Sequence, residues 1–271
     1  METDFLQLRD KTILITGVAN RRSIAWSVAK VLEEAGARLV FLFRSPELRD
    51  KNLALLGKEN AETCVCDVED EAQVEGLAPW AAENSLVFDG ILHSIAFANY
   101  SEGVRPFHEV KKRDFLQAMD ISCFSLAALC NALKANLAEN ASIVTLSISS
   151  TKMAAESYGY MGPVKAALDS SVVFLAKSLT SQVSPHIRVN AVGASPLKTS
   201  ASAGIPGYID AYLFAEKATL RHQALETSEA ANVAAFLLSP RSSGINAQTI
   251  VVDAGMSCNY FDSDIIHTQQ L

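Results

Sequence analysis

Short apolar segments alternate with longer amphipathic segments along almost the whole chain, and this alternation limits the fold more than any other feature of the sequence. Strands that are joined through helices run parallel, and right-handed crossovers place helices on both faces of the sheet. We therefore predict an α/β fold: a single Rossmann-like, doubly wound domain over residues 1–271, with a seven-stranded parallel sheet flanked by helices. The predicted strands are 12–16, 39–43, 63–66, 90–95, 142–147, 187–192 and 249–252, and the predicted helices are 23–35, 47–56, 69–82, 111–137, 157–183 and 226–238.

Composition and charge narrow the class of protein. Hydrophobic residues make up 49% of the 271 residues and charged residues 20%, which is typical of a folded globular protein. The net charge of −7, without a basic block, argues against nucleic-acid binding. No apolar run reaches the length of a membrane span, and the first ten residues lack the core of a signal peptide. The five cysteines fit no zinc pattern, so we expect buried free thiols and a cytoplasmic protein.

Candidate ligand residues follow the predicted strands, and in a doubly wound sheet ligands bind beyond the carboxyl ends of the strands. Gly17 follows the first strand, where a glycine permits a tight turn. The backbone amides of Ser23 and Ile24 would then open the next helix toward an anion. The later glycines of a GxGxxG fingerprint are absent, so an ordinary strand-to-helix turn is an equal alternative for this segment.

Polar or small residues follow the next strands as well. Arg44 stands where an arginine can hold the extra phosphate of NADP, although a solvated arginine without a ligand competes with this interpretation. Asp67 either accepts a hydrogen bond from an adenine amine or caps the next helix. Small residues at 94–98 would let a cofactor approach the backbone, whereas Asn190 is predicted to be a structural hydrogen-bonding residue. Jointly these positions fit a nicotinamide dinucleotide laid across the strand ends.

Tyr158 and Lys165 are separated by seven residues near the start of a predicted long helix. Seven residues are two helical turns, so we expect both side chains on one face. An ammonium beside a phenol stabilises the phenolate and lowers the phenol pKa toward neutrality. Taken alone, such a pair is more often two solvated surface residues of an amphipathic helix.

Together these motifs resemble the short-chain dehydrogenase/reductase superfamily, and within it the enoyl-acyl-carrier-protein reductases of bacterial and plastid fatty-acid synthesis. The resemblance covers nearly the whole chain. The Ser-Ile-Ala turn at 23–25 and the seven-residue separation of Tyr158 and Lys165 are specific to this branch, because most other members have Gly-Ile-Gly and a separation of four. Further matching segments are 16–20, 66–68, 88–90, 93–98, 161–162, 188–191, 195–199 and 252–255.

The resemblance implies a role for each matching residue. Tyr158 would donate to the carbonyl oxygen of a trans-2-enoyl thioester, Lys165 would bind the cofactor ribose, and hydride from NADH or NADPH would add to the β-carbon. Arg44 tilts the expected cofactor toward NADPH. The other implied cofactor contacts are Gly17, Ala19, Ser23 and Ile24 at the pyrophosphate, Asp67 and Val68 at the adenine, Ser94, Ile95 and Ala96 at the nicotinamide ribose, and Leu197 and Thr199 at the carboxamide and phosphate. The residues predicted on the substrate side, besides Tyr158, are Ala98, Ile148, Met161, Ala201 and Ile205, and no metal is expected.

Two positions depart from the family pattern. Ile148 stands where the family usually has a second aromatic residue, most often tyrosine, before the catalytic tyrosine. The segment 200–210 carries no lysine or arginine, and Asp210 has the wrong sign for an acidic carrier protein. Whether the acyl thioester is delivered on acyl carrier protein therefore stays open. The small residues of 200–207 predict a loop that can cover the site.

Other functions remain compatible with the sequence. A divergent reductase of ketones or aldehydes would use Thr145 or Ser147 beside Tyr158. A nucleotide-binding protein without catalysis would not need both Tyr158 and Lys165. By resemblance we also expect a homotetramer, assembled through the two long predicted helices, which carry small and apolar residues on more than one face.

Overall fold

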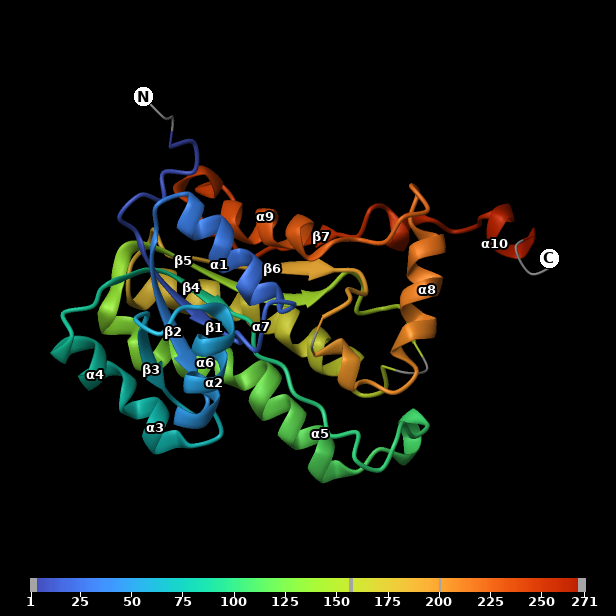
Figure 1. Cartoon of the computed structure of the whole chain (residues 1–271), viewed down its shortest axis with the longest axis horizontal. Helices are drawn as coiled ribbons and strands as arrows, with labels where there is room; N and C mark the ends of the chain where they lie inside the picture. The colour runs from blue at the N-terminus through green and yellow to red at the C-terminus, as the bar shows by residue number, and fades with distance from the viewer. Residues whose placement is uncertain (1–3, 156–157, 200, 268–271) are drawn as a thin grey trace.

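All seven predicted strands form one sheet in the computed structural model, which describes residues 4–155, 158–199 and 201–267 (Figure 1). The strand order is β3-β2-β1-β4-β5-β6-β7, and every neighbouring pair is parallel. The predicted doubly wound sheet is therefore confirmed. The strands are β1 (Thr12–Thr16), β2 (Arg38–Phe43), β3 (Glu62–Val65), β4 (Phe88–His93), β5 (Leu137–Ile148), β6 (Arg188–Ala194) and β7 (Thr249–Val252). Residues 1–3, Ser157, Ser200 and 268–271, which belong to predicted segments, lie outside the described residues.

Helices cover both faces of the sheet, and each face has its own hydrophobic core. Since most strand residues are buried on one side or the other, the strands are apolar without alternation. One face carries α1 (Ile24–Glu34), α2 (Pro46–Leu56) and α9 (Thr227–Leu238). The other face carries α3 (Glu71–Glu75), α4 (Leu77–Glu83), α5 (Lys112–Met119), α6 (Ser125–Leu133) and α7 (Met161–Gln182).

The predicted helix 69–82 begins later and is divided. Asp70 is the N-cap of α3, because its carboxylate accepts hydrogen bonds from the amides of Ala72 (3.0 Å) and Gln73 (3.2 Å). The helix then ends at Gly76, and α4 starts at the next residue.

The two long predicted helices are also shorter than expected. The run 111–137 is interrupted by a π-helical turn, η2 (Asp120–Phe124), and ends in a 3-10 turn, η3 (Lys134–Asn136). The run 157–183 becomes helical only at Met161, because residues 158–160 form a turn in which Gly159 has a φ of 52°.

The helical run 112–136 corrects the expectation that no segment is apolar and long enough to cross a membrane. By length and composition alone this run passes that test. Half of its most apolar stretch is buried inside the protein, and Leu126, Leu129 and Leu133 belong to the core beneath the sheet. The run is therefore a core element of this fold.

The cysteines follow the prediction at four of five positions. Cys64, Cys66, Cys123 and Cys130 are buried and free, whereas Cys258 is free but exposed. Burial raises the pKa of Cys64, Cys66 and Cys130 to about 12, so these three thiols stay protonated.

The helix α8 (Tyr208–Ala218) belongs to neither covering layer. It follows β6 and a short 3-10 turn, η4 (Ser202–Gly204), and stands apart from the helices that flank the sheet (orange in Figure 1). Ile209, Leu213 and Phe214 leave an exposed apolar side on this helix. After β7 the chain runs past α8 and forms the short helix α10 (Ser263–His267).

Candidate active site

The strand order reverses between β1 and β4, which lie side by side at the middle of the sheet. Thr16 at the end of β1 ties the two strand ends together: its Oγ1 donates to the Leu92 carbonyl (3.0 Å) and accepts from the Ser94 amide (2.9 Å). Gly17 has a φ of 77°, and a Cβ added there would lie 1.8 Å from the Ser94 carbonyl oxygen. Only glycine fits this close approach of the two strand ends, which lies at the reversal where doubly wound sheets bind ligands.

The first turn of α1 differs from the prediction at Ser23. Its amide donates to the Asn20 carbonyl (3.1 Å) and is therefore not available to an anion. The Ser23 hydroxyl accepts from the Trp26 amide (3.4 Å) and caps the helix. Ile24 is the first helical residue and Ala19 in the preceding loop is exposed, so these two keep their predicted access to a ligand.

The ends of β2 and β3 present one exposed and two half-buried candidates. Arg44 is exposed directly after β2. Asp67 and Val68 are half-buried after β3, and Asp67 accepts from the Glu69 amide (3.2 Å). The alternative role of Asp67 as a helix cap is wrong, because Asp70 caps α3.

The segment 94–97, which contains the predicted contacts Ser94, Ile95 and Ala96, is held at both ends by hydroxyl groups. At one end the Ser94 amide donates to Thr16, as described above. At the other end Ser122 Oγ in η2 accepts from the Phe97 amide (2.9 Å) and donates to the Phe97 carbonyl (3.1 Å). Sequence reasoning missed Ser122, because its role depends on the π-helical turn that brings it to this segment.

His93 was also missed, although it directly precedes Ser94. Its ring is buried between β5 and α6, with Nδ1 2.8 Å from Thr145 Oγ1 and Nε2 2.8 Å from Ser125 Oγ. Burial, and then the charge of Lys165, lowers its pKa to about 3, so the ring is neutral. Ser125 donates its only hydroxyl proton to the Ile121 carbonyl (2.6 Å). Nε2 must therefore carry the ring proton, and Nδ1 must accept from Thr145.

This arrangement removes Thr145 as a substrate contact. Thr145 is fully buried, and its hydroxyl donates to His93 Nδ1, with the His93 carbonyl 3.2 Å away. The interpretation as a carbonyl reductase that polarises its substrate through Thr145 therefore loses its main support. Asn190 is structural as predicted: its side chain donates to the Ile245 carbonyl (2.9 Å) and accepts from the Gln248 amide (3.1 Å).

Lys165 is buried in the second turn of α7. Its Nζ donates to the Leu146 carbonyl on β5 at 2.7 Å. Burial lowers the pKa of Lys165 to about 8, against the opposing influence of Asp169 and Cys123. The side chain thus reaches the carboxyl end of the sheet with an ammonium whose charge depends on pH near neutrality.

Tyr158 differs from its prediction in two ways. It lies in the turn before α7, so it does not share a helix face with Lys165. Its pKa is raised above 10, first by burial and then by the phenols of Tyr100 and Tyr208, so it is not lowered toward neutrality. The phenol remains a hydrogen-bond donor over the whole physiological range. Within the described ranges its hydroxyl has no hydrogen-bond partner, which leaves that donor available.

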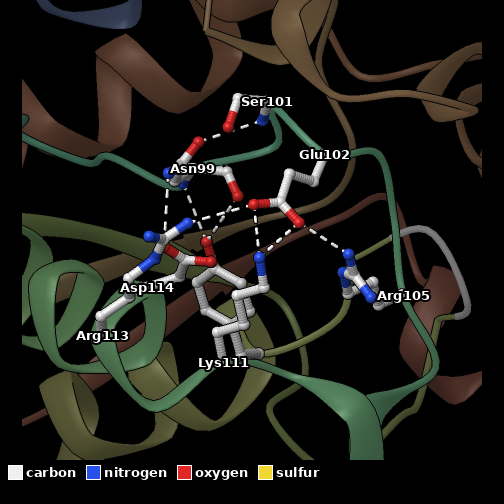
Figure 2. A network of polar contacts seen from close by, with 8 residues as sticks. Asn99, Ser101, Glu102, Arg105, Lys111, Arg113 and Asp114 are labelled. Atoms are coloured by element: carbon white, nitrogen blue, oxygen red, sulfur yellow. Dashed lines mark hydrogen bonds and ion pairs between the residues drawn. The ribbon is translucent and has the colours of Figure 1, made fainter.

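An aromatic wall and an ion-pair network lie next to Tyr158. The Tyr160 ring stacks on Tyr100 with centroids 6.2 Å apart, and its hydroxyl accepts from the Asn99 amide (2.8 Å). Figure 2 shows Glu102 at the centre of the network, bound by Lys111, by Arg105 (2.6 Å) and by Arg113 (3.1 Å). A small cavity lies between wall and network. It is lined by Asn99, Tyr100, Glu102, Gly103, Val104, Arg105, Val110, Lys111, Asp114, Gly159 and Tyr160.

The segment after β6 is hydrogen-bonded to the first residue of α8. Leu197 is buried, and Tyr208 Oη bonds to both of its backbone groups, accepting from the amide (2.8 Å) and donating to the carbonyl (2.9 Å). Thr199 is half-buried, and its amide donates to Ser202 Oγ (2.9 Å). Among the predicted substrate contacts, Ala98, Ile148 and Ile205 are half-buried, Ala201 is exposed and Met161 is buried in the core.

The chain is similar to known proteins over most of its length. A family model described as Enoyl-(Acyl carrier protein) reductase matches residues 17–257. Enoyl-[acyl-carrier-protein] reductase [NADPH] FabI of Staphylococcus aureus is 36% identical over 253 residues, covering 92% of this chain and 98% of the relative. The [NADH] FabI of Bacillus subtilis is 36% identical over 251 residues, covering 92% and 96%. The crystal structure of enoyl-[acyl-carrier-protein] reductase (NADH) from Aquifex aeolicus VF5 aligns with a TM-score of 0.88 at 32% identity, covering 94% of this chain and 99% of that chain.

Proposed function

Because the chain belongs to the enoyl-(acyl carrier protein) reductase family, we propose that it reduces 2-enoyl thioesters with NADH or NADPH in fatty-acid synthesis, and that Tyr158 and Lys165 carry the reaction. The observation that carries the residue assignment is the Tyr158 phenol. It is kept protonated and it is available to donate; of its neighbours, Tyr100 belongs to the segment after β4 and Tyr208 binds the segment after β6.

The residues at the strand ends fit a dinucleotide. Gly17 lies at the β1–β4 reversal, and the N-terminus of α1, which favours an anion, follows the loop 18–23. The half-buried Asp67 suits the adenine. The segment 94–97, which two hydroxyl groups hold in place, suits the nicotinamide ribose. Lys165 would bind that ribose through its ammonium. The dihydronicotinamide supplies the hydride when it is bound.

Tyr158 would donate a hydrogen bond to the thioester carbonyl oxygen. When the β-carbon gains hydride, negative charge develops on this oxygen, so a donor placed there stabilises the transition state more than the ground state. The raised pKa of Tyr158 keeps the proton on the phenol until that charge has formed. His93 and Ser122 act indirectly, because they fix the elements that carry the segment 94–97.

Turnover with NADH and NADPH in parallel tests this function. Purified protein and a crotonyl thioester should oxidise the cofactor, followed as loss of absorbance at the reduced-nicotinamide band. We expect faster turnover with NADPH, because the exposed Arg44 can hold the additional phosphate. Cofactor binding without turnover on any enoyl thioester would contradict the function, and equal rates would contradict the role of Arg44.

The affinity for NADH should fall as pH rises through about 8. Lys165 has its pKa lowered from 10.5 to about 8, so it is an ammonium below that pH and a neutral amine above it. Charged donors bind more strongly than neutral ones, so we expect an affinity about three- to tenfold lower at pH 9.5 than at pH 6.5. Fluorescence titration with NADH measures this, and Lys165→Met should bind weakly with no such slope. A wild-type affinity that is flat across this range would exclude Lys165 as the charged contact.

A carrier protein would be recognised through the network around Glu102. The segment 201–210 offers no cation, whereas Arg105, Lys111 and Arg113 converge on the Glu102 carboxylate (Figure 2), beside the cavity that Gly159 and Tyr160 help to line. Three cations against the carboxylates of Glu102 and Asp114 leave one excess positive charge in this network, in a chain with a net charge of −7. Such a patch would steer an acidic carrier toward the site.

The double variant Arg105→Gln/Lys111→Gln should therefore raise the KM for a carrier-protein thioester about tenfold, with kcat unchanged. The KM for an N-acetylcysteamine thioester, which has neither protein nor phosphate, should not change. Lys51→Gln on α2 is the matched control for loss of an exposed cation. A double variant with an unaltered KM for the carrier thioester would place the docking surface elsewhere.

Assembly would use the outer sides of the long helices. Phe124, Val173 and Phe174 are exposed there, at 61%, 49% and 76% of their surface, and a second copy would cover them. We propose a homotetramer, which light scattering after size exclusion would detect. A monomer at assay concentration would contradict it.

A further inference from the structure

The Tyr208 hydroxyl uses both backbone groups of Leu197. It accepts from the Leu197 amide at 2.8 Å and donates to the Leu197 carbonyl at 2.9 Å. Burial raises the pKa of Tyr208, which keeps the hydroxyl protonated and able to serve in both directions. Ser202 Oγ also lies 2.9 Å from this carbonyl and 3.0 Å from the Thr199 carbonyl, so its one proton is shared between the two.

A primary carboxamide offers the same two functions as this hydroxyl. Its oxygen accepts from an N–H group and its nitrogen donates to a carbonyl. Leu197 is the residue expected to hold the carboxamide of the nicotinamide ring. A backbone amide has one proton to donate, so the carboxamide and Tyr208 cannot both bind Leu197 through it.

We propose that Tyr208 is an internal ligand of the carboxamide-binding position, and that the bound cofactor displaces it. This inference rests on the proposed function, since it takes Leu197 as the carboxamide contact. Tyr208 is the first residue of α8, so displacement would act on the helix that stands over this end of the sheet (Figure 1). A second contact, the Lys198 ammonium 4.2 Å from the centre of the Tyr212 ring, would keep α8 attached to the same segment.

The coupling between cofactor and α8 runs in both directions. If the cofactor releases Tyr208 from Leu197, then the Tyr208–Leu197 contact must weaken cofactor binding by the same factor. Removal of the hydroxyl alone should therefore strengthen binding. This sign is opposite to that expected for a residue that contacts the cofactor.

The test compares Tyr208→Phe with the wild type in fluorescence titrations with NADH and calorimetric titrations with ADP-ribose. We expect NADH to bind about 3- to 30-fold more tightly to the variant, as follows from losing two competing hydrogen bonds. ADP-ribose lacks the nicotinamide ring, so its affinity should be unchanged. Tyr212→Phe, four residues along the same helix, is the matched control: it keeps the ring beneath Lys198, and its affinity for NADH should equal that of the wild type.

Each other outcome is decisive. Unchanged or weaker NADH binding by Tyr208→Phe overturns the inference, and so does an equal gain for ADP-ribose, because the gain would then not come from the carboxamide. Thermal melting of both variants shows whether each protein is folded at the temperature of the titrations. Tightened NADH binding without enoyl reduction would overturn the proposed function alone, whereas a wild type that binds neither NADH nor NADPH would overturn both.

Discussion

Tyr158→Phe is expected to lower kcat about 10²- to 10³-fold, the loss seen when one donor to a developing oxyanion is removed. The phenol has no partner in the described part of the chain, so its removal breaks no internal hydrogen bond and should leave folding stability almost unchanged. The cofactor affinity should also stay close to that of the wild type, because the proposed contact to the ribose comes from Lys165 and not from Tyr158. Single-turnover kinetics with a crotonyl thioester, together with an NADH titration, measure both quantities.

Tyr160→Phe is the matched control for Tyr158→Phe, because it removes a phenol hydroxyl that has a structural role. The Tyr160 hydroxyl bonds to both backbone groups of Asn99, at 2.8 and 3.1 Å, and the residue is 5% exposed. Its loss should cost about 1–3 kcal/mol of folding stability, because two backbone groups lose their partner, and should change kcat only a few-fold. If Tyr158→Phe turned over like the wild type, the carbonyl oxygen would be polarised by another group.

Gly17→Ala is expected to destabilise the protein by about 3–5 kcal/mol and to abolish cofactor binding. The added methyl group would lie 1.8 Å from the Ser94 carbonyl oxygen, and relief of that overlap requires the ends of β1 and β4 to separate. Separation would also break the hydrogen bonds of Thr16 to Leu92 and Ser94. Urea unfolding and an NADH titration measure the two effects.

Gly57→Ala is the matched control for the backbone conformation alone. Gly57 ends α2 with a φ of 68°, close to the 77° of Gly17, but an added Cβ there meets nothing within 4 Å. This variant should lose only about 1 kcal/mol, the cost of a left-handed conformation for an alanine. Equal losses for the two variants would show that the steric approach to Ser94 contributes nothing.

The strands could be predicted from the sequence because burial on both faces of the sheet gives each strand a continuous apolar run. All seven apolar segments form strands, and the candidate ligand residues follow several of them at the carboxyl edge. The helix ends were predicted less well, because they depend on short-range competition. Asp70 rather than an earlier residue caps α3, and Gly159 delays α7 until Met161.

The finer chemistry of the site depends on contacts between residues far apart in the chain. Ser122 reaches Phe97 only through the π-helical turn η2, and no periodicity in the sequence marks a π turn. The expected coupling of Tyr158 to Lys165 assumed a shared helix, whereas the surroundings of Tyr158 are other phenols. The hydrogen bond between the Leu197 amide and the Tyr208 hydroxyl could not be predicted either, because no sequence pattern links these two residues.

The uneven burial of the five thiols makes the natural chain suitable for site-selective labelling. Four cysteines are enclosed in the core, whereas Cys258 is exposed in the 3-10 turn η6 (Met256–Cys258). The adjoining Asn259 donates to the Ala218 carbonyl at the end of α8 (3.0 Å). A maleimide dye would therefore attach at one place without any engineered cysteine, and its emission would report on the helix that Tyr208 begins.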